Sequence, residues 1–332
     1  MDTLEELSDL IAARREKLAE LRRRGCDPFA QERFPRTHTT VAAAAAFREW
    51  EAAGGVGPAP QAALAGRLTA RRVMGKKAIF LDLRDMAGRL QLYARADHLG
   101  EEPFACVDLL DLGDIVGVRG TLFRTRAGEI TLDLHELVPL AKALRPLPFP
   151  KEREGQTWGG LQDVETRYRQ RYADLAVHPH VREQFLRRSR LVSEIRRFFE
   201  ERGYVEVETP VLQAVAGGAA ARPFLTHHHA LDLTLHLRIS LELYLKRLLV
   251  GGIEKVFEIG RVFRNEGIST RHNPEFTLLE SYEAYANLED IEDLVEALIV
   301  RLTTALWGRP AFPFRGEWID ASPPWPRLPM LE

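Results

Sequence analysis

The chain has 332 residues, of which 45% are hydrophobic and 28% are charged, and a chain of this length can bury two or more hydrophobic cores. Its formal net charge is −2, which does not indicate a protein that binds nucleic acid through overall positive charge, so any contact with RNA must come from local patches. The N-terminus is too charged for a signal peptide and no apolar run approaches membrane-spanning length, which predicts a cytoplasmic protein with no membrane partner.

The first part of the chain predicts two helices. Apolar residues recur at helical spacing in the first helix, which ends at Gly25 and Asp27–Pro28. Its basic side either touches an RNA backbone or is a solvated face, because several glutamates dilute the charge. The second predicted helix is the alanine-rich segment 41–53. Cys26 and Cys106 lie far apart in the sequence, which argues against a disulfide framework or a zinc site and favours a reducing cytosol.

Between residues 64 and 143 the hydrophobic pattern changes to period two, which is typical of β-strands. The strand pairing that places the aliphatic residues on one face puts Asp82 opposite Gln91 and Phe80 opposite Tyr93 on the other face. One face then packs inward, and the other carries aromatic rings and an amide outward.

Further short strands at 115–123 and 129–137, with glycine-containing turns between them, predict a small antiparallel barrel. An aromatic residue such as Phe80 on the polar face of such a sheet suits stacking on an unpaired base. The alternative is a partly covered surface phenylalanine, because exposed aromatic residues are common.

A proline- and charge-rich connector at 143–155 leads to the second half of the chain. Residues 182–202 predict a long amphipathic helix, with Gly203 just past its end. The alternating segment 204–210, YVEVETP, predicts a short strand that proline ends.

A Gly/Ala-rich turn precedes the next strands and includes Gly217–Gly218, where the backbone can approach a ligand closely. Three consecutive histidines, 227–229, do not predict a metal site, because only two of them share a strand face and no suitably spaced third ligand follows. Ser240 can cap the following helix, which carries Glu242 in its first turn; there the helix dipole alone favours a carboxylate.

Residues 257–280 have apolar ends and a charged middle, which predicts a β-hairpin with a cationic loop. The loop includes Arg264, and the outgoing strand begins near Phe276. A guanidinium group can fork onto a phosphate and an aromatic face can stack on a base, so this hairpin could hold a nucleotide. The alternative is a surface hairpin with solvated charges. After it, Asn287 caps a helix that ends at Gly308.

The pattern Phe-Arg-x-Glu, a short basic loop and His-Asn-x-x-Phe, at 263–276, resembles motif 2 of the class II aminoacyl-tRNA synthetases. The helix 182–202 with the strand and proline after it resembles motif 1. The segments GGAAARPF (217–224) and ELYLKRL (242–248) are similar to the bacterial-type class II lysyl-tRNA synthetases rather than to the aspartate and asparagine enzymes.

This resemblance implies an α+β protein with an N-terminal helix and OB-fold anticodon-binding domain at 1–143, a linker at 144–180 and the N-terminal part of a class II catalytic domain, built on an antiparallel sheet, at 181–332. It implies that L-lysine and ATP, with Mg²⁺, form lysyl-adenylate, and that the lysyl group passes to the 3′-end of tRNA(Lys). A homodimer through the motif 1 region is also implied.

The resemblance also implies roles for individual residues, with Arg264 as the catalytic residue that grips the α-phosphate and the lysine carboxylate. Glu280 lies in phase with Phe276 and Tyr282 on one strand, so all three can face one pocket. The implied ATP-binding residues are Arg264, Glu266, His272, Asn273 and Phe276. The implied lysine-binding residues are Gly218, Glu242, Arg264, Glu280 and Tyr282. The implied anticodon-binding residues are Phe80, Gln91 and Glu129.

No segment matches the family's motif 3, a Gly-rich stretch followed by an arginine on a helix. The sequence therefore predicts an incomplete catalytic sheet, no metal-binding carboxylates in this chain and no lysine ligation by the chain alone. Two alternatives stay open: a non-catalytic tRNA-binding or regulatory paralogue, and one half of a split synthetase. The intact pattern around Arg264 speaks against the paralogue, and Glu242 with the GGAAARPF turn disfavours an aspartate or asparagine ligase.

Overall fold

The computed structural model describes residues 4–75, 77–153 and 156–328. It divides into two compact units, residues 1–181 and 182–332. Within the described residues, no helix is both long enough and apolar enough to span a membrane.

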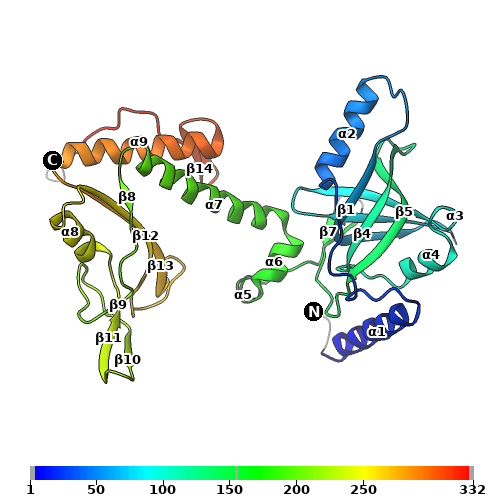
Figure 1. The fold of residues 1–332 in the computed structure, drawn as a ribbon, viewed down its shortest axis with the longest axis horizontal. Helices are drawn as coiled ribbons and strands as arrows, with labels where there is room; N and C mark the ends of the chain where they lie inside the picture. Colours follow the sequence, from blue (N-terminus) through cyan, green and yellow to red (C-terminus); the bar gives the residue numbers. More distant parts are fainter. Residues whose placement is uncertain (1–3, 76, 154–155, 329–332) are drawn as a thin grey trace. The chain divides into compact units, whose positions relative to one another are not determined.

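The first unit is built on a closed five-stranded barrel, in the strand order β1-β2-β3-β5-β4 (Figure 1). Its strands are β1 (Gln61–Val73), β2 (Ala78–Arg84), β3 (Arg89–Arg95), β4 (Ile115–Arg124) and β5 (Ile130–Ala141). The predicted register is confirmed, because Asp82 pairs with Gln91 and Phe80 with Tyr93. Alternate aliphatic residues fill the barrel, among them Leu83 and Leu92, which are fully buried. The strand β1 was not predicted as a separate strand.

Four helices precede the barrel strands or connect them: α1 (Leu4–Arg23), α2 (Thr40–Ala52), α3 (Ala96–Leu99) and α4 (Glu101–Asp108). The first ends as predicted, with Gly25 at a φ of 74°. The N-terminus of α2 is fixed on the barrel because the Asp85 carboxylate accepts hydrogen bonds from the Thr40 amide (2.8 Å) and hydroxyl (2.7 Å).

The structure pairs Cys26 with Cys106 in a disulfide, with Cα atoms 7.0 Å apart. The prediction from sequence separation, which argued against disulfide bonding, is therefore wrong. The residues just after α1 fold against α4, so two cysteines that are distant in the chain become neighbours in space. Distance along the chain gives no information on such a contact.

The segment predicted as a linker contains short elements: β6 (Lys151–Arg153), β7 (Gln156–Trp158), α5 (Val164–Arg169) and α6 (Arg171–Val177). Asp174 on α6 is fully buried and accepts hydrogen bonds from Arg167 (2.9 Å), Arg171 and His178 (2.7 Å). One carboxylate thus ties α5 to both ends of α6.

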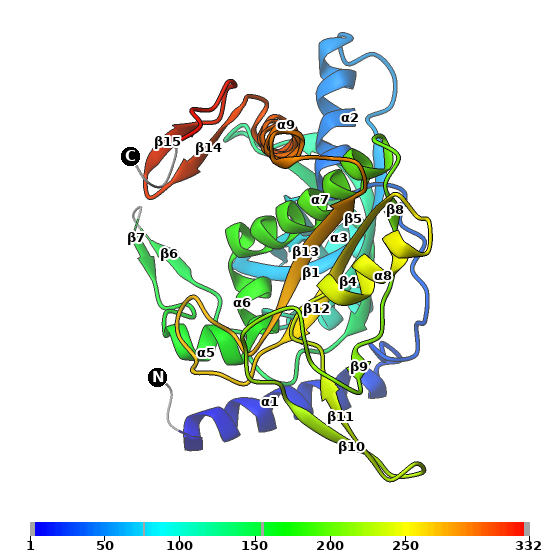
Figure 2. The ribbon, with the colours of Figure 1, turned by 90° about the vertical axis from the view of Figure 1, so that its left-hand side faces the viewer.

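The second unit contains a sheet in the order β13-β12-β8 between two layers of helix (Figure 2). Its elements are α7 (Pro179–Glu200), β8 (Val205–Glu206), β9 (Leu212–Gln213), β10 (Leu225–His228), β11 (Leu233–Leu237), α8 (Glu242–Val250), β12 (Lys255–Phe263), β13 (Glu275–Glu283) and α9 (Leu288–Trp307). Phe257 packs on one face with Phe199 of α7 and Leu302 of α9. Val256 packs on the opposite face with Leu245 of α8.

One local prediction differs from the structure in extent. The strand expected over 204–210 is limited to Val205–Glu206, because the chain pairs with β12 only there. The predicted cap of the last long helix is confirmed, since Asn287 and Asp290 form a capping box. The proline-rich segment beyond Gly308 contains a hairpin that the sequence analysis did not predict, β14 (Ala311–Phe314) with β15 (Glu317–Asp320).

Candidate functional site

The predicted hairpin is present as β12 and β13, which pair without interruption from Lys255–Glu283 to Phe263–Glu275. The Arg264 amide donates to the Pro274 carbonyl (2.8 Å), which closes the base of the loop between the strands. A cavity of about 350 Å³ lies at this loop. Its lining comprises Arg264, Glu266, Gly267, Arg271, His272, Asn273, Pro274 and Phe276.

The guanidinium and the ring expected to hold a nucleotide share this cavity. The Cζ atom of Arg264 lies 5.3 Å from the centroid of the Phe276 ring, within the range of a cation–π contact. Arg264 Nε donates to the Ile239 carbonyl (3.4 Å), and Ser269 Oγ lies 2.8 Å from His272 Nδ1 across the loop. A cationic fork beside a partly buried aromatic ring that lines the same cavity can bind phosphate oxygens and a flat base together.

A second group of predicted residues meets around Ser240, immediately before α8. The Glu280 carboxylate accepts hydrogen bonds from Ser240 Oγ (3.1 Å), the Leu241 amide (3.2 Å) and the Tyr282 hydroxyl (2.9 Å). Gly218 has a φ of 84°, and a Cβ atom there would lie 2.9 Å from Ser240 Oγ and 3.1 Å from Glu242 Cβ. Only glycine fits this close approach without strain. The predicted common face for Glu280 and Tyr282 is confirmed.

The charge of this second group is negative. Burial, together with the hydrogen bond to Glu280 and the nearby charges of Glu280 and Glu242, raises the pKa of Tyr282 well above its ordinary value, so its phenol remains a donor. Glu242 pairs with Lys246 one turn along α8 (2.6 Å). Two carboxylates and a phenol oxygen form a suitable environment for an ammonium ion.

A buried ion pair, which the sequence analysis missed, supports both groups. Arg238 and Glu258 are 4% and 2% exposed, and their side chains are joined at 2.6 Å. Arg238 also donates to the carbonyls of Arg261 (2.7 Å) and Thr209 (2.9 Å), while the Thr209 hydroxyl donates to Glu258 (2.6 Å). A Cβ atom at position 260 would lie 2.3 Å from the Arg238 guanidinium, so Gly260 leaves room for it.

On the barrel, Phe80 stacks on Tyr93 with the ring centroids 4.5 Å apart. Gln91 Nε2 donates to Glu129 (3.0 Å), and Gln91 Oε1 accepts from Thr131 (2.9 Å). Gln91 faces the predicted side of the sheet, but the expectation of an outward amide is wrong in one respect: the side chain is only 4% exposed, because Glu129 and Thr131 cover it. The three predicted residues therefore lie on the outer face of β2, β3 and the entry to β5.

Two further differences from the sequence analysis concern residue roles. Ser240 does not occupy the N-cap position of α8, which is Leu241, although its hydroxyl accepts from the Glu242 amide (3.1 Å). The hydrogen bond from Ser240 to Glu280 was not predicted. The only signal in the sequence that could have placed Ser240 at this site is its position two residues before Glu242. Tyr93 was placed on the correct face but was not included among the base-stacking residues.

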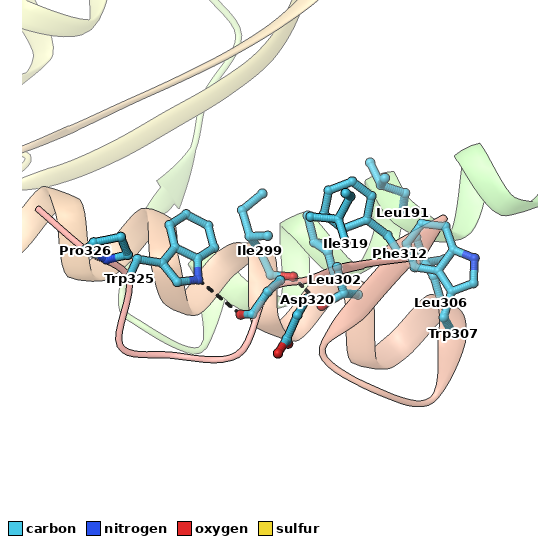
Figure 3. A pocket seen from close by; sticks show the side chains of 12 residues that line it. Leu191, Ile299, Leu302, Leu306, Trp307, Phe312, Ile319, Asp320, Trp325 and Pro326 are labelled. Atoms are coloured by element: carbon cyan, nitrogen blue, oxygen red, sulfur yellow. Dashed lines mark hydrogen bonds between the residues drawn. The ribbon is translucent and has the colours of Figure 1, made fainter. Parts of the chain in front are cut away.

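A larger cavity of about 670 Å³ lies elsewhere in the second unit, between α7, α9 and the β14–β15 hairpin (Figure 3). Leu191, Ile299, Leu302, Phe312 and Trp325 line it, and Trp325 Nε1 donates to the Ala321 carbonyl (3.1 Å). Its wall is almost entirely apolar. It offers no charged group suited to a triphosphate, so the smaller cavity at the hairpin is the better nucleotide site.

The first unit is thus a five-stranded barrel with an aromatic face, and the second unit presents an arginine and a phenylalanine in one cavity at the end of the antiparallel β12–β13 hairpin. The model for tRNA synthetases class II (D, K and N) matches residues 163–332, and the model for OB-fold nucleic acid binding domains matches residues 62–140. The chain belongs to the class II tRNA synthetases of the D, K and N group.

Similar proteins agree with this family. The chain is 51% identical over 329 residues to a lysine–tRNA ligase of Moorella thermoacetica, covering 99% of this chain and 64% of that protein. It is 51% identical over 328 residues to a lysine–tRNA ligase of Pelotomaculum thermopropionicum, covering 99% and 62%, and 45% identical over 328 residues to that of Bacillus subtilis, covering 99% and 64%. The chain thus spans less than two thirds of the length of these curated relatives.

Proposed function

We propose that this protein acts in the ATP-dependent activation of L-lysine to lysyl-adenylate and in the transfer of lysine to the 3′-end of tRNA(Lys). The observation that carries the proposal is the shared cavity of Arg264 and Phe276, joined through Ile239 and Ser240 to the acidic group at Glu280. A nucleotide site therefore adjoins an ammonium site. The similar proteins are named lysine–tRNA ligases, which supports lysine as the amino acid that this site would bind.

The hairpin cavity would bind ATP. Phe276 would stack on the purine, Arg264 would bind the α-phosphate and the lysine carboxylate, and His272 and Asn273 would contact the phosphates and the base, with Glu266 near adenine. The lysine carboxylate attacks the α-phosphorus and pyrophosphate leaves, so the protein mainly positions the groups and neutralises their charge. Mg²⁺, when bound, would neutralise phosphate charge. Glu266 is the only carboxylate among the described lining residues and would be the residue of this chain that holds the ion, with the substrate phosphates as its other ligands.

The group around Ser240 would bind lysine. Gly218 and Glu242 would contact the α-amino group, because the missing Cβ atom at Gly218 leaves space above the Glu242 stem. Tyr282 would face the ε-amino end, with Glu280 holding its phenol in place. The raised pKa of Tyr282 keeps the phenol neutral, so its oxygen can accept a hydrogen bond from an ammonium group while its proton goes to Glu280.

The barrel would read the anticodon of tRNA(Lys), with Phe80 stacking on a base and Gln91 and Glu129 offering hydrogen-bonding groups. A homodimer through the motif 1 region is part of the proposal, and the exposure of Phe185 and Val205, both 48%, is consistent with such an interface. We propose a cytoplasmic location, because the charging of tRNA takes place in the cytoplasm. The cysteine content does not support this location, because Cys26 and Cys106 form a disulfide.

The first test is ATP binding by the 332-residue chain, measured by isothermal titration calorimetry. Arg264→Gln should weaken ATP binding by about 10- to 100-fold, because it removes a charge-assisted hydrogen bond to phosphate. Arg261→Gln is the matched control, since this arginine lies on the same hairpin but is 56% exposed and pairs with Glu275 (3.5 Å). Equal effects of the two substitutions would rule out the proposed nucleotide site.

The second test is lysine-dependent exchange of pyrophosphate into ATP by a version of the chain extended to the full length of its lysine–tRNA ligase relatives, with aspartate and asparagine as competing amino acids. Exchange that requires lysine supports the full proposal. Binding of ATP and tRNA without exchange by any of the three amino acids would favour the non-catalytic paralogue instead. Exchange with aspartate or asparagine would overturn the assignment of the Ser240 group to lysine.

A further inference from the structure

Three side chains with metal-ligating atoms meet on the outside of the barrel. His98 lies on α3, which packs beside β5, and Asp133 and His135 lie on β5 itself (Figure 1). One ligand atom from each side chain falls within 4.8 Å of the other two. Among the described residues, these three form the only group of at least three His, Cys, Asp or Glu side chains that meets this condition.

The backbone of β5 is irregular where this group forms. Gly120 of β4 pairs with Leu134 and Arg119 pairs with Glu136, so His135 has no partner across the ladder and forms a β-bulge. A Cβ atom on Gly120 would lie 1.9 Å from the Asp133 carbonyl, which shows how closely the strands approach there. Bulges often aim a side chain at a site, and this one places His135 outward next to Asp133.

The chemistry of the group is that of a transition-metal site. His98 Nδ1 lies 2.7 Å from Asp133 Oδ2, as in a hydrogen bond that a metal ion would replace. The other oxygen, Asp133 Oδ1, is buried and has no hydrogen-bond partner within the described structure. A buried carboxylate oxygen without a donor is costly, so a cation at this place would satisfy a group that the protein leaves unpaired.

We propose that His98, Asp133 and His135 bind a divalent transition-metal ion of the zinc class. Two imidazole nitrogens and one carboxylate oxygen form a ligand set that zinc uses with water in the fourth position. Ligand atoms around tetrahedral zinc lie about 3.4 Å apart, so His98 Nδ1 and Asp133 Oδ2, now 2.7 Å apart, must separate slightly, and ligand atoms that lie further apart must move together. His98 and His135 can do so, because both are exposed.

The ion would join α3 to β5 beside the aromatic face of the barrel. Asp133 pairs with Tyr93 in the parallel register of β3 and β5, and Tyr93 stacks on Phe80. Metal binding would therefore stabilise the edge of the surface that carries Phe80. The site does not depend on the proposed function, because its geometry lies entirely within the barrel unit.

The test is a titration of the tag-free, chelator-treated 332-residue chain with Zn²⁺ against a chromophoric chelator, and with Co²⁺ followed by visible absorption. We expect one tightly bound ion per chain and the absorption bands of tetrahedral Co²⁺. His135→Gln should weaken Zn²⁺ binding by about 100-fold or more, because it removes one of the three ligands and not merely a group that orients a ligand. Because the His135 side chain is exposed, this variant should fold like the unaltered chain, and circular dichroism would verify this.

Two control variants locate the binding. His38→Gln removes a partly buried histidine of the same unit, and His227→Gln disrupts the histidine run, in which the rings of His227 and His229 lie 5.1 Å apart. Both should bind Zn²⁺ like the unaltered chain. If His135→Gln also binds like the unaltered chain, or if only His227→Gln lowers the affinity, the proposed site is wrong.

Discussion

The buried pair of Arg238 and Glu258 allows a sharp test of how the second unit is held together. Replacing Glu258 by Gln leaves the shape of the side chain but removes its charge, so the Arg238 guanidinium remains buried at 4% exposure without a counterion. Breaking a buried pair by removing one partner costs about 3–5 kcal/mol. That is a large fraction of the free energy of unfolding of a typical domain, about 5–15 kcal/mol.

The same hairpin offers a matched control. Arg261 and Glu275 face each other at 3.5 Å with more than half of each side chain exposed. Glu275→Gln should therefore lower the free energy of unfolding by no more than about 1 kcal/mol. The two substitutions change the same residue type on one hairpin and differ mainly in burial, so their difference measures the effect of desolvation.

Urea unfolding followed by tryptophan fluorescence measures this difference. Trp307, Trp318 and Trp325 report on the second unit, while Trp50 and Trp158 belong to the first, so substitution of these two by Phe isolates the signal. A second measurement is ATP affinity. It should fall with Glu258→Gln, because the segment from Arg238 to Ile239 bonds to Phe263 and Arg264.

Two outcomes refute the reasoning. One is a decrease in the free energy of unfolding from Glu258→Gln that is no larger than the decrease from Glu275→Gln. The other is an Arg238→Met/Glu258→Leu double variant less stable than Glu258→Gln alone, because an apolar replacement of both partners should avoid the unpaired charge. Gly260→Ala should also destabilise the unit, since its methyl group would meet the Arg238 guanidinium at 2.3 Å.

Three further predictions follow from the site and the barrel. Phe80→Ala should weaken binding of a tRNA(Lys) anticodon stem–loop by about 1–3 kcal/mol in fluorescence anisotropy, and an unchanged affinity would exclude stacking on this ring. Gly218→Ala, at a φ of 84° and facing Ser240, should weaken lysine binding about tenfold and leave ATP binding intact in calorimetry, whereas equal loss of both would indicate general unfolding. Burial by itself would raise the pKa of Asp174, but hydrogen bonds from His178 and Arg167 outweigh it and hold the pKa below its usual value. The stability that this carboxylate contributes is present above its unfolded pKa, about 3.9, and is lost as the pH falls through the lower folded pKa. The unaltered chain and Asp174→Asn should therefore differ less in free energy of unfolding as the pH falls into this acid range. A difference that does not change with pH would contradict this reasoning.

Much of the local structure followed from the sequence. Alternation of aliphatic and polar residues fixed the pairing of Phe80 with Tyr93, because a slip by one residue would turn every apolar side chain of the strand out of the core. The same parity placed Phe276, Glu280 and Tyr282 on one face of β13. The loop composition then predicted that Arg264 and Phe276 could share a cavity, and the resemblance to motif 2 rested on those same residues.

Only the tertiary structure decided which of these surfaces meet. Ser240 joins Glu280 across 40 residues of sequence, and Arg238 joins Glu258 across 20, through segments that no local pattern relates. The pairing of Cys26 with Cys106 and the grouping of His98 with β5 arise in the same way. Periodicity tells which side of a strand or helix is apolar, but the partner of each side is chosen by the packing of the whole chain, because many partners of similar hydrophobicity would satisfy the same pattern.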